Sequence, residues 1–177
     1  MRQFSACFSI CTAVPARAGA SWALGPEGGI GDQGGKRGGL ALLRPWHWLN
    51  LGDCYLSGHW EAGISYWRAG REGRFGNDEI VDFSFTPTFR YQRDPRGGWI
   101  APYAEAGVGL HLLTNTSFGN DDYSIPFGFG SYAGIGVRFG QGGRFELGAR
   151  LQHISNADLG DRNPGANFQF LRFAYYF

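Results

Sequence analysis

Apolar and polar side chains alternate along most of this chain. The clearest run has apolar residues at every second position and polar residues between them: Val81, Phe83, Phe85, Pro87, Phe89 and Tyr91. Successive side chains of a strand point to opposite faces, so this period of two predicts β-strands with one apolar face. We expect eight strands, at about residues 20–26, 38–48, 56–68, 79–92, 99–113, 128–139, 144–154 and 167–177.

The polar rows of these strands carry acids and bases in equal number. The charged positions are Glu61, Asp82, Glu105, Glu146, Arg90, Arg138, Arg150 and Arg172. Such a mixture suits the packed, charge-paired interior of a narrow barrel, but it also suits the solvated face of a soluble sandwich or a lipocalin-like barrel. The apolar rows are long and rich in aromatic residues, which favours a lipid-facing band with aromatic girdles.

Short and long connections alternate between the predicted strands. The gaps at 49–55, 93–98 and 140–143 are short, and those at 27–37, 69–78, 114–127 and 155–166 are longer. Bacterial outer-membrane barrels have short turns at one rim, long loops at the other and an even number of strands, and closure leaves no exposed edge. We therefore predict an all-β fold, an eight-stranded antiparallel transmembrane β-barrel of the bacterial outer membrane. The last strand supports this, because Leu171, Phe173, Tyr175 and Phe177 share one face.

Composition is consistent with this fold. The chain has 30 glycines and 16% aromatic residues, which favours strands joined by many turns. A net charge of +1 gives no reason to expect nucleic acid as a partner. No run of about 18 apolar residues is present, so a membrane-spanning helix is not expected.

The first residues have the features of a secretory signal peptide. Arg2 precedes the apolar stretch FSACFSICTAV, and ARA at 16–18 fits the cleavage pattern. We expect residues 1–18 to be the signal peptide and residues 19–177 the outer-membrane β-barrel. Cleavage would remove Cys7 and Cys11 and leave Cys54 alone, so no intramolecular disulfide is expected.

Two other features suggest chemistry but lack the context for it. GIGDQG at 29–34 has the spaced glycines of a dinucleotide-binding loop, but it follows no buried strand and opens no helix, so we interpret it as a flexible loop. The four histidines lack metal-ligand spacing, so no metal site is expected. His59 and His111 fall in the polar rows as hydrogen-bonded interior side chains, whereas His47 lies near a turn.

The segment ARLQHISNADLG at 149–160 places polar groups on an apolar row. His153 and Ser155 continue the apolar face of their strand, with Cβ atoms roughly 6–7 Å apart. A histidine can activate a neighbouring serine as a nucleophile, especially when a third group orients the ring. Counting back along the outward row of the last strand reaches Asn167, whose carbonyl could accept a hydrogen bond from the imidazole. Spacing alone leaves catalysis and interfacial decoration both open.

HISNADLGDRNPGAN at 153–167 resembles the lipid A 3-O-deacylase (PagL) family, as do LSGHWEAGISYW at 56–67 and PYAEAGVGL at 102–110. The resemblance covers most of residues 38–177. It implies an eight-stranded outer-membrane barrel with a Ser-His-acid triad on its outer face, which removes the ester-linked 3-hydroxyacyl chain at position 3 of lipid A. It also implies His153 as general base, Ser155 as nucleophile, Asn163 in the oxyanion hole and Asn156 in arranging the site.

The chain departs from the family at the position of the orienting acid. The family usually has a glutamate fourteen residues beyond the histidine, and this chain has Asn167. An asparagine can hold an imidazole tautomer but supplies no negative charge for the imidazolium. Asp158 or Asp161 in the adjacent loop could supply that charge, although neither lies on the outward row of a strand.

The expected reaction is serine attack on the ester and release of the acyl-enzyme by water, without a cofactor. The expected partners are lipid A or lipopolysaccharide as substrate and the outer-membrane lipids, with no nucleic acid and with a homodimer left open. Three alternatives remain at this point. They are a non-enzymatic structural or adhesive barrel, a soluble lipocalin-like carrier, and a different lipid A enzyme such as an acyltransferase.

Overall fold

A computed structural model describes residues 22–70, 78–93 and 100–177 of the chain. The expected signal peptide at 1–18, with Cys7 and Cys11, lies outside the described residues, as do the connecting segments 71–77 and 94–99. Within the described ranges, no helix is long and apolar enough to cross a membrane.

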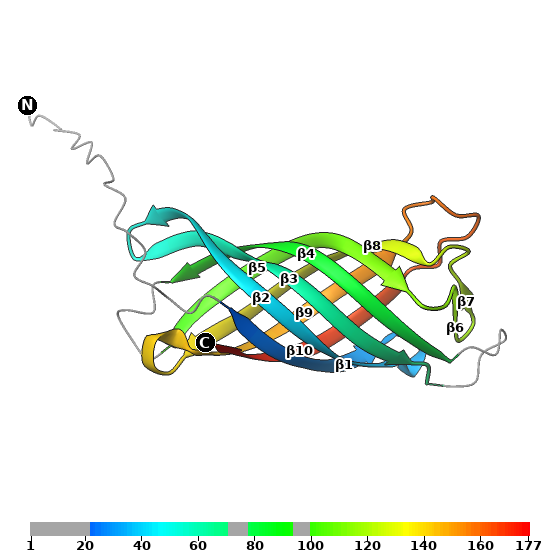
Figure 1. The fold of residues 1–177 in the computed structure, drawn as a ribbon, viewed down its shortest axis with the longest axis horizontal. Helices are drawn as coiled ribbons and strands as arrows, with labels where there is room; N and C mark the ends of the chain where they lie inside the picture. The colour runs from blue at the N-terminus through cyan, green and yellow to red at the C-terminus, as the bar shows by residue number, and fades with distance from the viewer. Residues whose placement is uncertain (1–21, 71–77, 94–99) are drawn as a thin grey trace, which may run out of the picture.

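Eight long antiparallel strands close into a barrel, as predicted (Figure 1). Around the barrel the order is β1-β10-β9-β8-β5-β4-β3-β2, so the first and last strands pair with each other. The strands are β1 (Ala23–Gly31), β2 (Lys36–Leu51), β3 (Cys54–Arg68), β4 (Glu79–Arg93), β5 (Ile100–Leu113), β8 (Phe127–Phe139), β9 (Phe145–Ser155) and β10 (Ala166–Tyr176). Closure pairs the backbone of every long strand on both sides, so the barrel has no free edge.

The apolar rows point outward and the polar rows inward. Exposed and buried residues alternate along all of β5, and the exposed row from Ile100 to Leu112 is entirely apolar. On the outer surface Val108 is 61% and Ile135 68% exposed, whereas the charged side chains of Glu105 and Arg150 are buried. A soluble carrier would bury its apolar rows, so the soluble lipocalin-like alternative is wrong.

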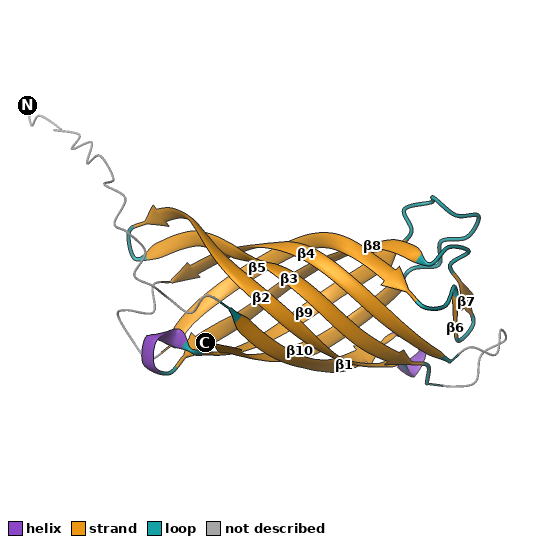
Figure 2. Cartoon of the chain, viewed as in Figure 1, coloured by secondary structure: helices purple, strands orange, loops and turns teal. Residues whose placement is uncertain are grey.

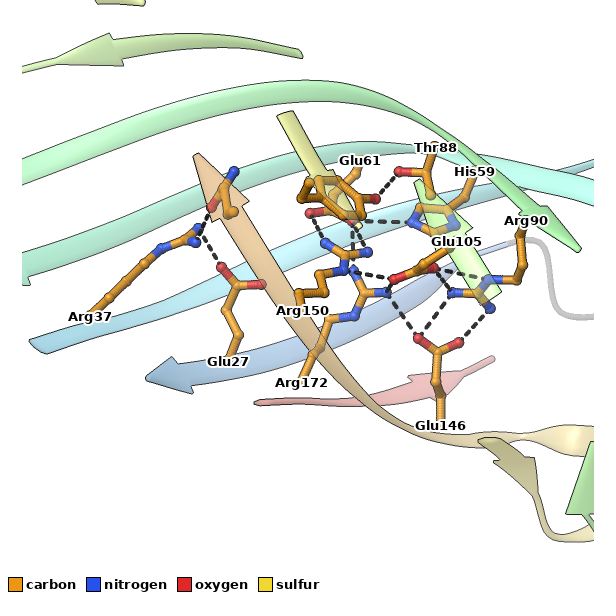
Figure 3. Close-up of polar contacts among 12 residues, drawn as sticks. Glu27, Arg37, His59, Glu61, Thr88, Arg90, Glu105, Glu146, Arg150 and Arg172 are labelled. Atoms are coloured by element: carbon orange, nitrogen blue, oxygen red, sulfur yellow. Dashed lines mark hydrogen bonds and ion pairs between the residues drawn. The ribbon is translucent and has the colours of Figure 1, made fainter. Parts of the chain in front are cut away.

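Three glutamates and three arginines form one ion-pair network across the middle of the barrel (Figure 3). Arg150 contacts Glu61 at 2.8 Å and Glu105 at 2.7 Å, and Glu105 contacts Arg90 at 2.6 Å. The remaining members are Glu146, paired with Arg90, and Arg172, paired with Glu61 and Glu146. Six of the eight charged residues predicted in the polar rows therefore neutralise one another inside the barrel, whereas Asp82 pairs with His111 and Arg138 donates to the Gly143 carbonyl.

The two interior histidines are hydrogen-bonded, as predicted. His59 Nε2 lies 3.1 Å from Glu61 Oε2, and His111 Nδ1 lies 2.8 Å from Asp82 Oδ1. His47 lies at the end of β2 near the β2–β3 turn and bonds to Asn50 at 3.0 Å. Each of these three imidazoles is therefore hydrogen-bonded to a different side chain.

The two rims of the barrel differ. One carries the C-terminus, the β2–β3 turn and the 3₁₀ turn η3 (Gln141–Gly143) (Figure 2). The other, which we name the loop rim, carries η1 (Asp32–Gly34), the small strands β6 (Ser117–Phe118) and β7 (Asp121–Asp122), and the loop 156–165. Apolar side chains fill the barrel beneath the loop rim: Trp67, Ile80, Leu113, Phe118, Tyr123, Ile154, Phe168 and Phe170.

The predicted long, flexible first loop is wrong. β1 continues to Gly31 and β2 begins at Lys36, so GIGDQG belongs partly to a strand and partly to η1. Positions 29 and 31 of β1 face the interior and are glycines because the aromatic side chains of β10 occupy the space: a Cβ on Gly31 would lie 2.6 Å from Phe168 Cε1. Glycine therefore hid the alternation, and the extended strand carries Asp32 to the end of β10.

Candidate active site

His153 and Ser155 end strand β9 on its outward face. Ile154 between them is 2% exposed and points into the barrel, whereas His153 is exposed and Ser155 is half-buried. The predicted orientation of both side chains is therefore confirmed. They lie where the apolar outer surface meets the loop rim, which is a position from which polar groups can reach the membrane interface.

The predicted partner of the imidazole is in place. The register of β9 and β10 sets Asn167 opposite His153, and Asn167 Oδ1 lies 2.8 Å from His153 Nδ1. Of the predicted site residues, His153 and Asn167 are the two whose side chains hydrogen-bond to each other across neighbouring strands.

Asp32 lies on the other side of Asn167. Its Oδ2 accepts a hydrogen bond from Asn167 Nδ2 at 2.8 Å and one from the Asn167 backbone N–H at 3.0 Å. The expectation that Asp158 or Asp161 would supply the charge is corrected here, because Asp158 Oδ1 accepts from Asn163 Nδ2 at 2.9 Å and Asp161 is exposed in the loop. Asp32 did not stand out in the sequence because β1 runs five residues beyond its predicted end at residue 26.

Asn156 organises the loop that follows the serine. It is 2% exposed, and its Nδ2 donates to the carbonyls of Tyr123 and Arg162, both at 2.7 Å. Its Oδ1 accepts from the backbone N–H of Asp158 at 3.0 Å. The bends so stabilised include positive φ angles at Ala157 and Asp158, 53° and 60°, which non-glycine residues adopt only when their surroundings impose them.

Asn163 returns the loop toward the serine. Its Oδ1 accepts from the backbone N–H of Asn156 at 2.9 Å, and its Nδ2 donates one hydrogen to Asp158. With the amide held at both ends, the second Nδ2 hydrogen is the one left for another acceptor. The two asparagines therefore shape one loop. The roles expected from the family resemblance, Asn163 in the oxyanion hole and Asn156 in arranging the site, stay predictions.

Gly165 leaves the space that the imidazole occupies. A Cβ there would lie 2.8 Å from His153 Cε1 and 3.4 Å from Nε2, and the φ of Gly165 is 71°. The phenol of Tyr123 donates to the Gly165 carbonyl at 3.4 Å. Burial, followed by the charges of Asp121 and Asp32, raises the pKa of Tyr123, so this phenol is a neutral donor. Neither residue stood out in the sequence.

An apolar groove leads away from His153 along the outer surface. Its volume is about 790 Å³, and Phe89, Ala106, Val108, Ala133 and Leu151 line it together with His153 and Asn167. A second cavity of about 550 Å³ lies at the loop rim between Asp32, Phe118, Asp121 and Asn167. The polar site thus sits between an apolar groove and a polar recess.

Comparison with solved structures supports the membrane location. The crystal structure of the outer membrane enzyme PagL aligns with a TM-score of 0.78 and 29% identity, covering 88% of this chain and 99% of that chain. Neisserial surface protein A aligns with a TM-score of 0.56 at 12% identity over 91% of this chain and 100% of that one, which supports the barrel fold alone. The chain is a transmembrane barrel of the bacterial outer membrane.

Sequence comparison identifies the family. Lipid A deacylase PagL of Pseudomonas aeruginosa is 33% identical over 159 residues, 89% of this chain and 85% of that protein. Lipid A deacylase PagL of Bordetella bronchiseptica is 32% identical over 117 residues, 66% of this chain and 61% of that protein. The model of the lipid A 3-O-deacylase (PagL) family matches residues 37–176. This chain therefore belongs to the lipid A 3-O-deacylase (PagL) family.

Proposed function

We propose that this chain is a lipid A 3-O-deacylase that hydrolyses the ester-linked 3-hydroxyacyl chain at position 3 of lipid A by a serine-histidine mechanism. The observation that supports this most directly is the hydrogen bond of His153 to Asn167 on the lipid-facing surface, two residues before Ser155. Family membership supports the substrate class. A site in this position meets its substrate within the membrane.

In the first step Ser155 Oγ attacks the ester carbonyl carbon, and His153 Nε2 takes the hydroxyl proton. Nδ1 of the same ring is occupied by Asn167, so Nε2 is the nitrogen with a free lone pair. The tetrahedral intermediate collapses when the bond from the carbonyl carbon to the sugar oxygen breaks. His153 then returns its proton to that oxygen, which leaves as the 3-hydroxyl of the sugar.

Water completes the cycle. His153 accepts a proton from water as the oxygen attacks the acyl-enzyme, and then protonates Ser155 Oγ as the free 3-hydroxy fatty acid is released. Asn163, with the one Nδ2 hydrogen not given to Asp158, and a backbone N–H of the loop are the donors we assign to the oxyanion. The reaction balances with ester and water alone.

The groove below His153 fits the acyl chain. It runs along the apolar outer surface and begins at the imidazole. A chain lying there keeps its hydrocarbon in an apolar setting while the ester reaches Ser155 at the interface. This arrangement favours a membrane-embedded lipid ester over a soluble one.

Mass spectrometry of lipid A after expression in a Gram-negative host tests the proposal. We expect the wild type to remove one ester-linked 3-hydroxyacyl chain and Ser155→Ala to remove none, because loss of the nucleophile costs on the order of 10³-fold or more. Unchanged lipid A with a folded, membrane-inserted wild type would instead support the non-enzymatic structural or adhesive barrel.

Ser131 is the matched comparison. It lies opposite His153 on β8, so it is a second hydroxyl beside the imidazole, but it lies within a strand and has no loop like 156–165 after it. We expect Ser131→Ala to keep deacylase activity. If Ser131→Ala abolished the activity and Ser155→Ala did not, Ser131 would be the nucleophile and the assignment of Ser155 would be wrong.

A further inference from the structure

Closure of the barrel sets three polar side chains in one row at the loop rim. The register pairs Gly31 with Phe168, so the next residue, Asp32, comes beside Asn167, and Asn167 in turn pairs with His153. Two side-chain hydrogen bonds of 2.8 Å follow this order. Asn167 Nδ2 donates to Asp32 Oδ2, and Asn167 Oδ1 is the atom that faces His153 Nδ1. Asp32 and Asn167 are 135 residues apart in the chain.

An asparagine on its own is an ambiguous partner for an imidazole. Its amide can present either the oxygen or the NH₂ group to the ring nitrogen, and the two choices impose opposite tautomers. If the oxygen faces Nδ1, that nitrogen carries the proton and Nε2 is a base. If the NH₂ faces Nδ1, Nε2 carries the proton and accepts nothing. A glutamate offers only acceptors, so the family's usual residue at this position does not have this ambiguity.

Asp32 removes the ambiguity. A carboxylate only accepts hydrogen bonds, so the Asn167 atom that faces it must be the NH₂ group. The second bond, from the Asn167 backbone N–H at 3.0 Å, fixes the carboxylate in place. The amide oxygen is then the atom turned toward His153.

Building on the proposed function, we propose that Asp32 is a positioning residue of the active site, which acts through Asn167 to hold His153 in the tautomer with a basic Nε2. Its negative charge also polarises the amide, because hydrogen bonds in a chain strengthen one another. The Asp32–Asn167 pair thereby takes the place of the single glutamate that is usual in the family. The residue that orients the Asn167 amide and supplies the negative charge therefore lies on η1. The histidine, the serine and the asparagine lie on β9 and β10.

A double-mutant cycle tests this in purified protein with lipid A as substrate. We expect Asp32→Ala to lower kcat roughly 10- to 100-fold with little change in KM, the size typical of partners that orient a functional histidine. In an Asn167→Glu background the amide is gone and a carboxylate faces His153 directly. There, Asp32→Ala should cost nothing or raise kcat, because it removes a like charge next to the new glutamate.

The different effect of Asp32→Ala on kcat in the two backgrounds distinguishes a positioning role from a structural role. If Asp32 only held η1 in shape, its loss would cost the same in both backgrounds, and that result would overturn the proposal. An unchanged kcat for the single variant would overturn it as well. Asp161→Ala removes an exposed carboxylate from the same rim and serves as the control, with kcat expected within about twofold of wild type.

A direct reading of the tautomer separates this proposal from the proposed function. Long-range ¹H–¹⁵N spectra of histidine-labelled protein in micelles distinguish protonated Nδ1 from protonated Nε2, and His153→Gln assigns the signal. We expect protonated Nδ1 in the wild type and a shift toward protonated Nε2 in Asp32→Ala. That shift without deacylase activity would leave the positioning role standing and remove the proposed function. Deacylase activity without any tautomer shift in Asp32→Ala would overturn the positioning role and leave the proposed function standing.

Discussion

Gly165, the last residue before β10, lies against the ring of His153. A side chain there would meet His153 Cε1 at 2.8 Å, and the backbone has a φ of 71°. We expect Gly165→Ala to push the imidazole out of line with Ser155 and to lower deacylase activity about tenfold or more, since small misplacements of a catalytic group are costly. Initial rates on lipid A measure the effect, and heat-modifiable migration on gels shows that the barrel has formed.

Gly52→Ala is the matched control for backbone strain. Gly52 has a φ of 74° in the β2–β3 turn, and a Cβ there meets nothing within 4 Å. Both substitutions should therefore destabilise the fold by a similar amount, of order 1–3 kcal/mol, while the control keeps its activity. Equal activity losses in the two variants would show that strain, and not the contact with His153, is responsible.

The loop 156–165 behaves as one element held by Asn156. We expect Asn156→Ala to leave the carbonyls of Tyr123 and Arg162 without their donor, at a cost of about 1–3 kcal/mol to the folded loop. Deacylase activity should fall, and trypsin should cleave after Arg162 faster than in the wild type. Limited proteolysis followed by mass spectrometry measures this opening.

A second rim asparagine provides the comparison for the loop. Asn115 is half-buried and donates one hydrogen bond to the Glu79 carbonyl at 2.9 Å, outside the loop 156–165. Asn115→Ala should leave cleavage after Arg162 unchanged. Faster cleavage in both variants would mean that the rim loosens as a whole and that Asn156 has no special part in it.

At the scale of the whole molecule, the interior network replaces an apolar core in the middle of the barrel. Glu105 contacts Arg90 and Arg150, and its side chain is 1% exposed. We expect Glu105→Gln to leave uncompensated positive charge in the interior and to lower the free energy of unfolding by roughly 3–5 kcal/mol. Urea unfolding of the protein in micelles, followed by tryptophan fluorescence, measures the loss.

Asp53→Asn removes the same kind of charge from an exposed position in the β2–β3 turn. Its effect on the free energy of unfolding should stay within about 0.5 kcal/mol. A Glu105→Gln variant as stable as this control would show that the six charges do not act as one network.

The faces of the strands could be predicted from single residues and their neighbours. Val81 to Tyr91 alternate visibly, and the same period placed His153, Ser155 and Asn167 on the outer surface before any contact was known. The outward row from Phe177 back to Asn167 even predicted the contact with His153, because adjacent antiparallel strands joined by one loop share a register that can be counted along the chain. The roles of Ser155, Asn163 and Asn156 stay predictions from the family resemblance.

The alternation of apolar and polar residues did not predict the full length of β1, because glycine occupies several of its positions. β1 has glycine on both faces: Gly29 and Gly31 meet Phe170 and Phe168 inside the barrel, and Gly28 interrupts the outward row, so the alternation is lost and the strand looked like a loop. The same misreading concealed Asp32, the acid that accepts from Asn167, and drew attention to Asp158 and Asp161 in the loop between the serine and Asn167.

The sequence by itself determined the strands, their faces and the outward histidine and serine, because each depends on the period of two within one strand or one hairpin. Only the tertiary structure decided that Asp32 stands behind Asn167. That contact depends on the register between the first and last strands, which is established when the barrel closes and joins residues 135 apart. In this register Gly29 and Gly31 lie against Phe170 and Phe168, and such contacts between distant residues carry no repeating signal along the chain.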